Sequence, residues 1–184
     1  MAMTMKGAVE LPAPKEVVWA ALNDPEVLKS CIPGCECLDR IDGNRLKATA
    51  RVKVGPVAAA FKGQVNLLDL DPPNGYRIVG EGEGGVAGFA KGGAVVRLDS
   101  IPSGARLSYD VEAQVGGKLA QLGARLIDGV AKKMADQFFA DFAAAVAARG
   151  GVQAPPSPAP ASAPQAGLLA RLIALLKKIF GIAG

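Results

Sequence analysis

Histidine is absent from the 184 residues of this sequence, and aromatic residues make up only 5% of them. Because histidine is the commonest general base near neutral pH and a frequent zinc ligand, its absence argues against Ser-His-Asp hydrolysis and against the usual zinc enzymes. Proteins that bind nucleic acids combine a basic face with aromatic side chains on which bases stack. With so few aromatic residues, the sequence does not favour a nucleic-acid partner.

Cysteine is scarce too, and all three copies lie close together as Cys31, Cys35 and Cys37. An odd number in so short a span argues against a disulfide framework. Metal binding is the more specific interpretation, but three thiolates without histidine do not complete a four-ligand zinc site within one chain. We therefore expect free thiols with a structural role, and no metal.

Phosphate-binding motifs are weak or missing. Residues 80–85 match G-x-G-x-x-G, but no helix is expected directly after them and two glutamates within the run would repel a pyrophosphate. The sequence contains no G-K-[ST], so a P-loop is excluded. Glu81 and Glu83 share one face of a predicted strand, as do Asp110 and Glu112. Acid–base catalysis by such a pair stays open, although two carboxylates on one strand face more often only mark the face that is exposed to solvent.

Acidic residues stop at Asp141, whereas Arg149, Arg171, Lys177 and Lys178 follow it. These four basic residues equal the whole net charge of +4, so the preceding part of the chain is neutral. The sequence thus predicts a neutral body with a positive end. Residues 1–11 contain no apolar run of signal-peptide length, and we expect a cytoplasmic location.

The body begins with a short strand and two helices. Residues 3–11 alternate between apolar and polar side chains, which predicts a strand, and residues 15–22 predict a helix. Asn23-Asp24-Pro25 ends this helix and starts a shorter one that continues to residue 29. From 35 to 115 the alternation continues through several segments separated by turns such as 72–75. This pattern predicts an antiparallel sheet with one solvent-exposed face and one buried face.

Residues 117–148 change to a helical period, with an apolar side chain every three or four positions. We expect one helix of about 45 Å that crosses the sheet. Gly123 and Gly129 lie inside it, where glycine weakens a helix, and we expect them to allow the close approach of a backbone or a ligand.

The chain ends in two segments that differ from the body. Residues 150–166 are rich in Ala, Pro and Ser and carry no charge, which predicts a semi-rigid extended linker of up to about 3.1 Å per residue. Residues 167–184 predict an amphipathic helix with a basic face formed by Arg171, Lys177 and Lys178. We therefore divide the chain into a domain at 1–149, a linker at 150–166 and a docking helix at 167–184.

The helical part of the docking segment, residues 167–182, is about 24 Å long, short of the ~30 Å hydrocarbon core of a bilayer, so we expect it to lie in the membrane interface. A protein groove, or the helix's own domain, is an alternative docking surface for such a helix. The residues expected to contact the membrane are Leu168, Leu169, Arg171, Leu172, Ile173, Leu176, Lys177, Lys178, Ile179 and Phe180.

The order of strand, two short helices, long antiparallel sheet and long helix resembles the α+β helix-grip fold of the START/Bet v1-like (SRPBCC) superfamily. More specifically, the sequence resembles the CoxG family, which is named for carbon monoxide dehydrogenase. The resemblance is carried by residues 11–14 with Val17-Val18-Trp19, by residues 22–28 and by the Cys31-Ile32-Pro33-Gly34-Cys35-Glu36 stretch. The resemblance covers residues 1–149.

The resemblance implies an apolar cavity between the sheet and the long helix. It also implies association with molybdenum CO dehydrogenase at the inner face of the cytoplasmic membrane, and a quinone as a natural guest, with no covalent cofactor. We therefore expect a non-enzymatic, peripheral membrane adaptor that carries a quinone or another lipid. A maturation factor for the dehydrogenase cofactor and a small enzyme of the same fold stay as alternatives.

The alternation of the strands and the helix, rather than the resemblance, selects residues to line this cavity. Core packing is the competing role for each of them, because pockets and cores use the same apolar side chains. The candidates are Phe61, Val65, Ile78, Phe89, Tyr109, Leu122, Leu126 and Val130, with Phe89 expected at the opening.

Overall fold

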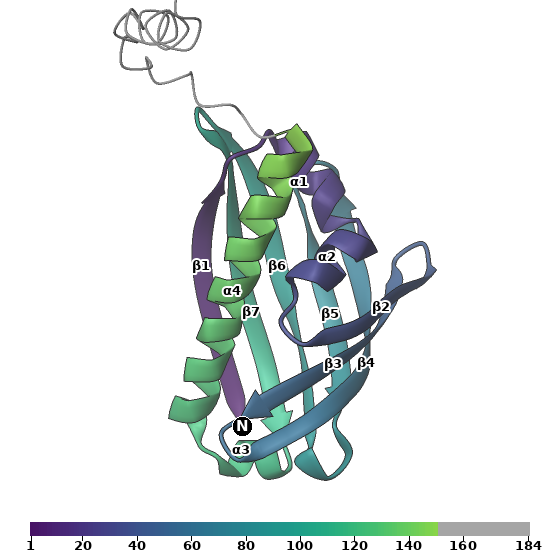
Figure 1. Cartoon of the computed structure of the whole chain (residues 1–184), viewed down its shortest axis with the longest axis vertical. Coiled ribbons are helices and arrows are strands. Elements are labelled where there is room, and N and C mark those ends of the chain that lie inside the picture. Colours follow the sequence, from purple (N-terminus) through teal and green to yellow (C-terminus); the bar gives the residue numbers. More distant parts are fainter. Residues whose placement is uncertain (151–184) are drawn as a thin grey trace, which may run out of the picture. The chain divides into compact units, whose positions relative to one another are not determined.

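The computed structural model describes residues 1–150 of the chain (Figure 1). The predicted linker beyond Gly150 and the predicted docking helix, with all of its membrane-contact residues, lie outside the described residues. The elements are β1 (Ala2–Leu11), α1 (Lys15–Leu22), α2 (Pro25–Cys31), β2 (Cys35–Asp42), β3 (Arg45–Val54), β4 (Val57–Asp71), β5 (Gly75–Glu83), the 3₁₀ turn η1 (Gly85–Ala87), β6 (Phe89–Ile101), β7 (Gly104–Gly116), α3 (Lys118–Gln121) and α4 (Ala124–Gly150).

The seven strands form one antiparallel sheet in the order β1-β7-β6-β5-β4-β3-β2. The strands from β2 to β7 are neighbours in both sequence and space, whereas β1 pairs with β7 from Ala2↔Gln114 to Leu11↔Ala105. The sheet curves around α4 (Figure 1). This is the predicted α+β helix-grip arrangement, with open edges at β1 and β2 rather than a closed barrel.

The start of α2 is linked to the end of α4 through one carboxylate. Asp24 caps α2 by accepting a hydrogen bond from the Glu26 amide at 3.0 Å. Its other oxygen accepts a hydrogen bond from Arg149 at 2.8 Å. The Arg149 guanidinium, which makes the larger contribution, and the amides of the helix start lower the pKa of Asp24.

The prediction of one helix over 117–148 is wrong. The chain forms the short α3, breaks at Leu122 and Gly123, and resumes as α4. The break occurs because Gly123 has a φ of +85°, a left-handed conformation that glycine adopts easily and that a continuous helix does not allow. The expected close approach of a backbone at Gly123 and Gly129 is also wrong, since a Cβ added at either residue would meet no atom within 4 Å. The approach of a ligand there stays a prediction.

Apolar side chains between the sheet and the helices form two separate clusters rather than one continuous core. The upper cluster joins α1, α2 and the C-terminal half of α4 to the sheet, and it includes the fully buried Phe142 and Val146. The lower cluster is built on Val54, Val115, Leu119 and Ile127, at the start of α4. The region between the two clusters is therefore where an internal site would lie.

Candidate functional site

The inner face of the sheet, turned toward α4, carries incompletely buried apolar side chains between the two clusters. Met5, Val111 and Ala94 occupy neighbouring positions on β1, β7 and β6. Each is only half-buried, and none belongs to either cluster. On α4, Met134 lies in the same interval and is also half-buried. We call these four residues, together with the glycines described next, the inner band.

The strand positions next to this row carry almost no side chains. Gly63, Gly80, Gly82 and Gly92 occupy inner-face positions on β4, β5 and β6. A Cβ at Gly92 would lie 2.7 Å from the Ala113 Cα, and one at Gly63 would lie 2.8 Å from the Gly82 Cα. These separations are too short for real Cβ atoms, so the strands bend at positions that only glycine tolerates. The same glycines leave the inner surface of the sheet bare.

Aromatic rings form the upper boundary of the inner band. Tyr109 stacks on Phe139 with ring centroids 5.1 Å apart and an interplanar angle of 21°. Phe138 contacts Phe139 edge-on and stacks on Phe142. Deeper in the upper cluster, burial raises the pKa of Tyr76 well above its usual value, so its phenol stays neutral. This boundary is therefore uncharged.

The residues predicted to line a cavity fall into three groups. Val65, Ile78 and Tyr109 pack against the upper cluster. Phe61, Leu122 and Val130 pack against the lower cluster. Phe89 and Leu126 are instead 42% and 39% exposed. The first two groups thus lie above and below the inner band.

Sequence reasoning missed the inner band itself. Met5 and Val111 were visible in the alternation of their strands, and Met134 in the helical period. The four glycines gave the stronger signal, because bare positions next to one another on paired strands indicate a surface that no side chain fills.

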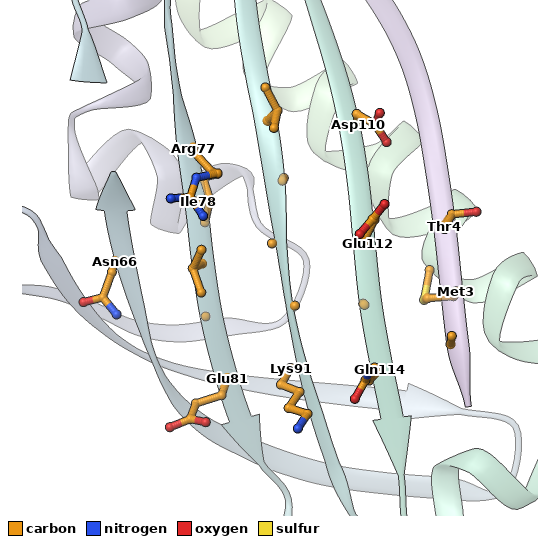
Figure 2. A pocket seen from close by; sticks show the side chains of 18 of the residues that line it. Met3, Thr4, Asn66, Arg77, Ile78, Glu81, Lys91, Asp110, Glu112 and Gln114 are labelled. Atoms are coloured by element: carbon orange, nitrogen blue, oxygen red, sulfur yellow. The ribbon is translucent and has the colours of Figure 1, made fainter. Parts of the chain in front are cut away.

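A hollow of about 1070 Å³ lies on the other face of the sheet, turned away from α4 (Figure 2). Of the residues predicted to line a cavity, it includes only Ile78. Its charged and polar side chains include Arg77, Glu81, Lys91 and Glu112. Glu81 and Glu83 share one strand face, as do Asp110 and Glu112, as predicted. No charged residue within 1–150 is buried as a whole, but one carboxylate oxygen of Asp110, which lines the hollow, is buried without a hydrogen-bond partner. The other oxygen accepts a hydrogen bond from Lys6 at 2.7 Å.

The three cysteines are free, as predicted, with Cys31 buried and the other two half-buried. Cys37 donates a hydrogen bond from its Sγ to Asp39 at 2.7 Å, and this contact raises the pKa of the Cys37 thiol. Burial raises the pKa of Cys35. Since the thiolate is the form that attacks and binds metals, both thiols are poor nucleophiles and ligands.

Residues 1–150 bring together no group of three or more Cys, Asp or Glu side chains that could hold a metal ion. None of the helices within this range is long and apolar enough to cross a bilayer.

Comparison with known proteins gives one family and many solved structures. The family model for CoxG, described as a subunit of carbon monoxide dehydrogenase, matches residues 7–147. A conserved protein from Geobacillus kaustophilus is 33% identical, with a TM-score of 0.75 over 79% of this chain and 96% of its own. No protein of curated function matches the sequence.

More distant structures share the fold alone. The ZhuI aromatase/cyclase from Streptomyces sp. R1128 is 13% identical, with a TM-score of 0.60 over 83% of this chain and 100% of its own. Ara h 8.0201 is 18% identical, with a TM-score of 0.56 over 80% of this chain and 99% of its own. The fold thus occurs in an enzyme as well as in proteins whose names state no activity.

Proposed function

Because this chain belongs to the CoxG family of carbon monoxide dehydrogenase subunits, we propose that it is a non-enzymatic membrane adaptor for molybdenum CO dehydrogenase. In this proposal the chain recruits the enzyme to the inner face of the cytoplasmic membrane. It also carries a quinone or a similar apolar lipid against the inner band. Family membership and the helix-grip fold support the broader role, a ligand-binding protein associated with the dehydrogenase.

The inner band is the observation that carries the ligand part of the proposal. Binding sites for small apolar molecules are concave and lined mainly by apolar side chains. Met5, Val111 and Ala94 are half-buried within strands of the sheet, and Met134 is half-buried within α4. A flat ring with an apolar tail would cover these side chains and the glycine surface beside them, at a gain of roughly 25 cal/mol per Å² of apolar area.

The chemistry of the described residues supports a carrier rather than an enzyme. The chain has no histidine, and no charged side chain within 1–150 is buried. The two half-buried thiols have raised pKa values. A reaction at the inner band would therefore have to proceed without a conventional acid, base or nucleophile facing the substrate.

The membrane part of the proposal depends on the predicted docking helix at 167–184. Its three basic residues would contribute roughly 3 kcal/mol at an anionic leaflet, about 1 kcal/mol each. The apolar face would supply the remainder, which favours reversible attachment.

Lipid analysis of the full chain purified from its host tests the ligand. We expect native mass spectrometry to show a bound species and organic extraction to release a quinone or another isoprenoid lipid. Ala94→Phe places a ring in the inner band, whereas Val95→Phe places the same ring on the opposite face of β6. We expect the first variant to lose the ligand and the second to retain it; equal ligand content in both would contradict this location.

Vesicle co-sedimentation of the full chain, compared with residues 1–166, tests the attachment. We expect the full chain to bind anionic vesicles and the shortened chain to bind several-fold less. Unchanged binding would show that residues 167–184 are not the docking element. Pull-down of the dehydrogenase by the full chain tests recruitment separately.

A further inference from the structure

Three segments meet at the end of the domain where α4 begins, the lower end in Figure 1. They are the β3–β4 turn (53–57), the η1 loop (83–89) and the stretch from the end of β7 into α4 (116–128), and together we call them the tip. A Cβ at Gly55 would lie 3.0 Å from Leu126 Cδ2, and one at Gly88 would lie 2.9 Å from the Gly117 Cα. The three segments thus touch one another and form one surface.

Large apolar side chains are exposed at the tip. Val86 is 84% exposed, and Phe89 and Leu126 are 42% and 39% exposed. Val86 has the largest exposure of any large apolar residue in the described part of the chain. Exposed apolar side chains gathered in this way commonly mark a surface that contacts a protein or a membrane.

The η1 loop holds Val86 in this outward position. Gly85 and Gly88 have φ values of +59° and +112°, which turn the backbone on either side of it. The next residue, Ala87, is buried and anchors the loop against the domain. Val86 is therefore presented by a constrained turn, and a binding partner would meet it with little loss of backbone entropy.

The tip carries three basic and two acidic side chains, a net charge of 3 − 2 = +1. Lys53, Lys118 and Arg125 are exposed, and none of them forms an ion pair within residues 1–150. Glu83 and Asp128 are the acidic residues of the tip. Toward the other end of the sheet, Asp69 and Asp71 lie at the end of β4 and Asp99 lies near the end of β6, and Asp69 forms an ion pair with Arg77.

We infer that the tip is a second membrane-contact surface, in which Val86 enters the interface of an anionic bilayer and the three basic side chains approach lipid phosphates. Protruding apolar side chains flanked by lysine and arginine are complementary to an anionic leaflet. The inference rests on the proposed function and adds which end of the domain faces the membrane. The end of the domain that carries the lower cluster then faces the bilayer, and an apolar lipid that moves between the membrane and the inner band passes this cluster.

The predicted linker is long enough to allow this contact in a chain that is also attached through residues 167–184. The helix α4 spans roughly 40 Å at 1.5 Å per residue, from the tip to Gly150. The composition of 152–166 predicts a reach of up to about 46 Å at 3.1 Å per residue. Attachment at the C-terminus therefore does not exclude the tip from the same surface.

Fluorescence quenching by brominated lipids tests the inference in the full chain. Trp19→Phe removes the only native tryptophan, and Val86→Trp then places a reporter at the tip. Ile41→Trp in the same background is a matched control, because Ile41 is 49% exposed but lies at the end of β2. The vesicles contain phosphatidylcholine and phosphatidylglycerol, with or without brominated acyl chains.

We expect bromination to reduce emission at least about two-fold for Val86→Trp and to leave Ile41→Trp nearly unchanged, because quenching requires insertion at the acyl boundary. Co-sedimentation without quenching of Val86→Trp would overturn the inference and leave attachment through 167–184 intact. Equal quenching of both variants would overturn it too. An emission change caused by purified dehydrogenase but not by vesicles would assign the tip to protein contact instead.

Discussion

Filling the inner band with a larger side chain tests whether it contains free space. Ala113 and Ala105 both lie on the inner face of β7, but Ala113 is half-buried next to Gly92, whereas Ala105 is 0% exposed in the upper cluster. Ala→Leu adds three carbon atoms, worth up to about 2.4 kcal/mol at 0.8 kcal/mol each when fully buried. At a half-buried position we expect about 1 kcal/mol of added stability.

At Ala105 the same substitution enters a packed core, where overpacking costs typically about 1–3 kcal/mol. We therefore expect Ala113→Leu and Ala105→Leu to differ by about 2–4 kcal/mol, with opposite signs. Urea unfolding of ligand-free protein, followed by circular dichroism, measures both free energies. If Ala113→Leu destabilises the protein as much as Ala105→Leu does, the inner band is packed and our reasoning about ligand binding is refuted.

Two further substitutions test contacts outside the inner band. Asp24→Asn keeps a capping side chain but removes the charge that pairs with Arg149, so we expect a loss of about 0.2–1 kcal/mol at pH 7 for this partly exposed pair. Because the folded-state pKa of Asp24 is lowered, the difference from wild type should begin to fall near the unfolded-state pKa of about 4 and vanish only below the folded-state pKa, as urea unfolding at pH 7 and at about pH 2 can show; a constant difference would contradict it. Gly7→Ala places a Cβ 2.6 Å from the Tyr109 Cζ. We expect the ring to leave its stack on Phe139, at a cost of about 1 kcal/mol and with a change in near-ultraviolet circular dichroism; unchanged spectra would contradict the proposed contact.

Local sequence signals predicted most of the fold. The helix at Lys15–Leu22 has the predicted bounds, since Pro14 precedes it and Asn23-Asp24-Pro25 follows it. The strand alternation placed Leu46, Val65 and Tyr109 on the inner face correctly, because the buried face of an antiparallel sheet leaves a period of two in the sequence.

The break in the long helix was not predicted because the apolar period runs through it. Leu119, Leu122 and Leu126 keep helical spacing on both sides of Gly123, and a single glycine inside such a pattern is usually tolerated. Glycine adopts a left-handed conformation easily but also occurs inside helices, so the spacing of the apolar residues alone does not show which of the two Gly123 adopts.

The hollow on the outer face was missed for a different reason. Its lining combines polar and charged side chains such as Glu81 and Lys91 with apolar ones such as Val79 and Val95, all in ordinary strand alternation. The twist of a sheet depends on how each strand pairs with its neighbours, and no local pattern in the sequence records this.

Glycines receive aromatic rings from neighbouring strands on the inner face of the sheet. The ring of Phe61 lies across Gly84, where a Cβ would come within 2.6 Å of it, and the ring of Tyr109 lies across Gly7. The ring of Tyr109 also stacks on Phe139 of α4. Next to these rings, Met5, Val111 and Ala94 stay half-buried beside the bare glycines. A ligand there would replace packing that the sequence does not provide, and we therefore expect ligand binding to raise the free energy of unfolding.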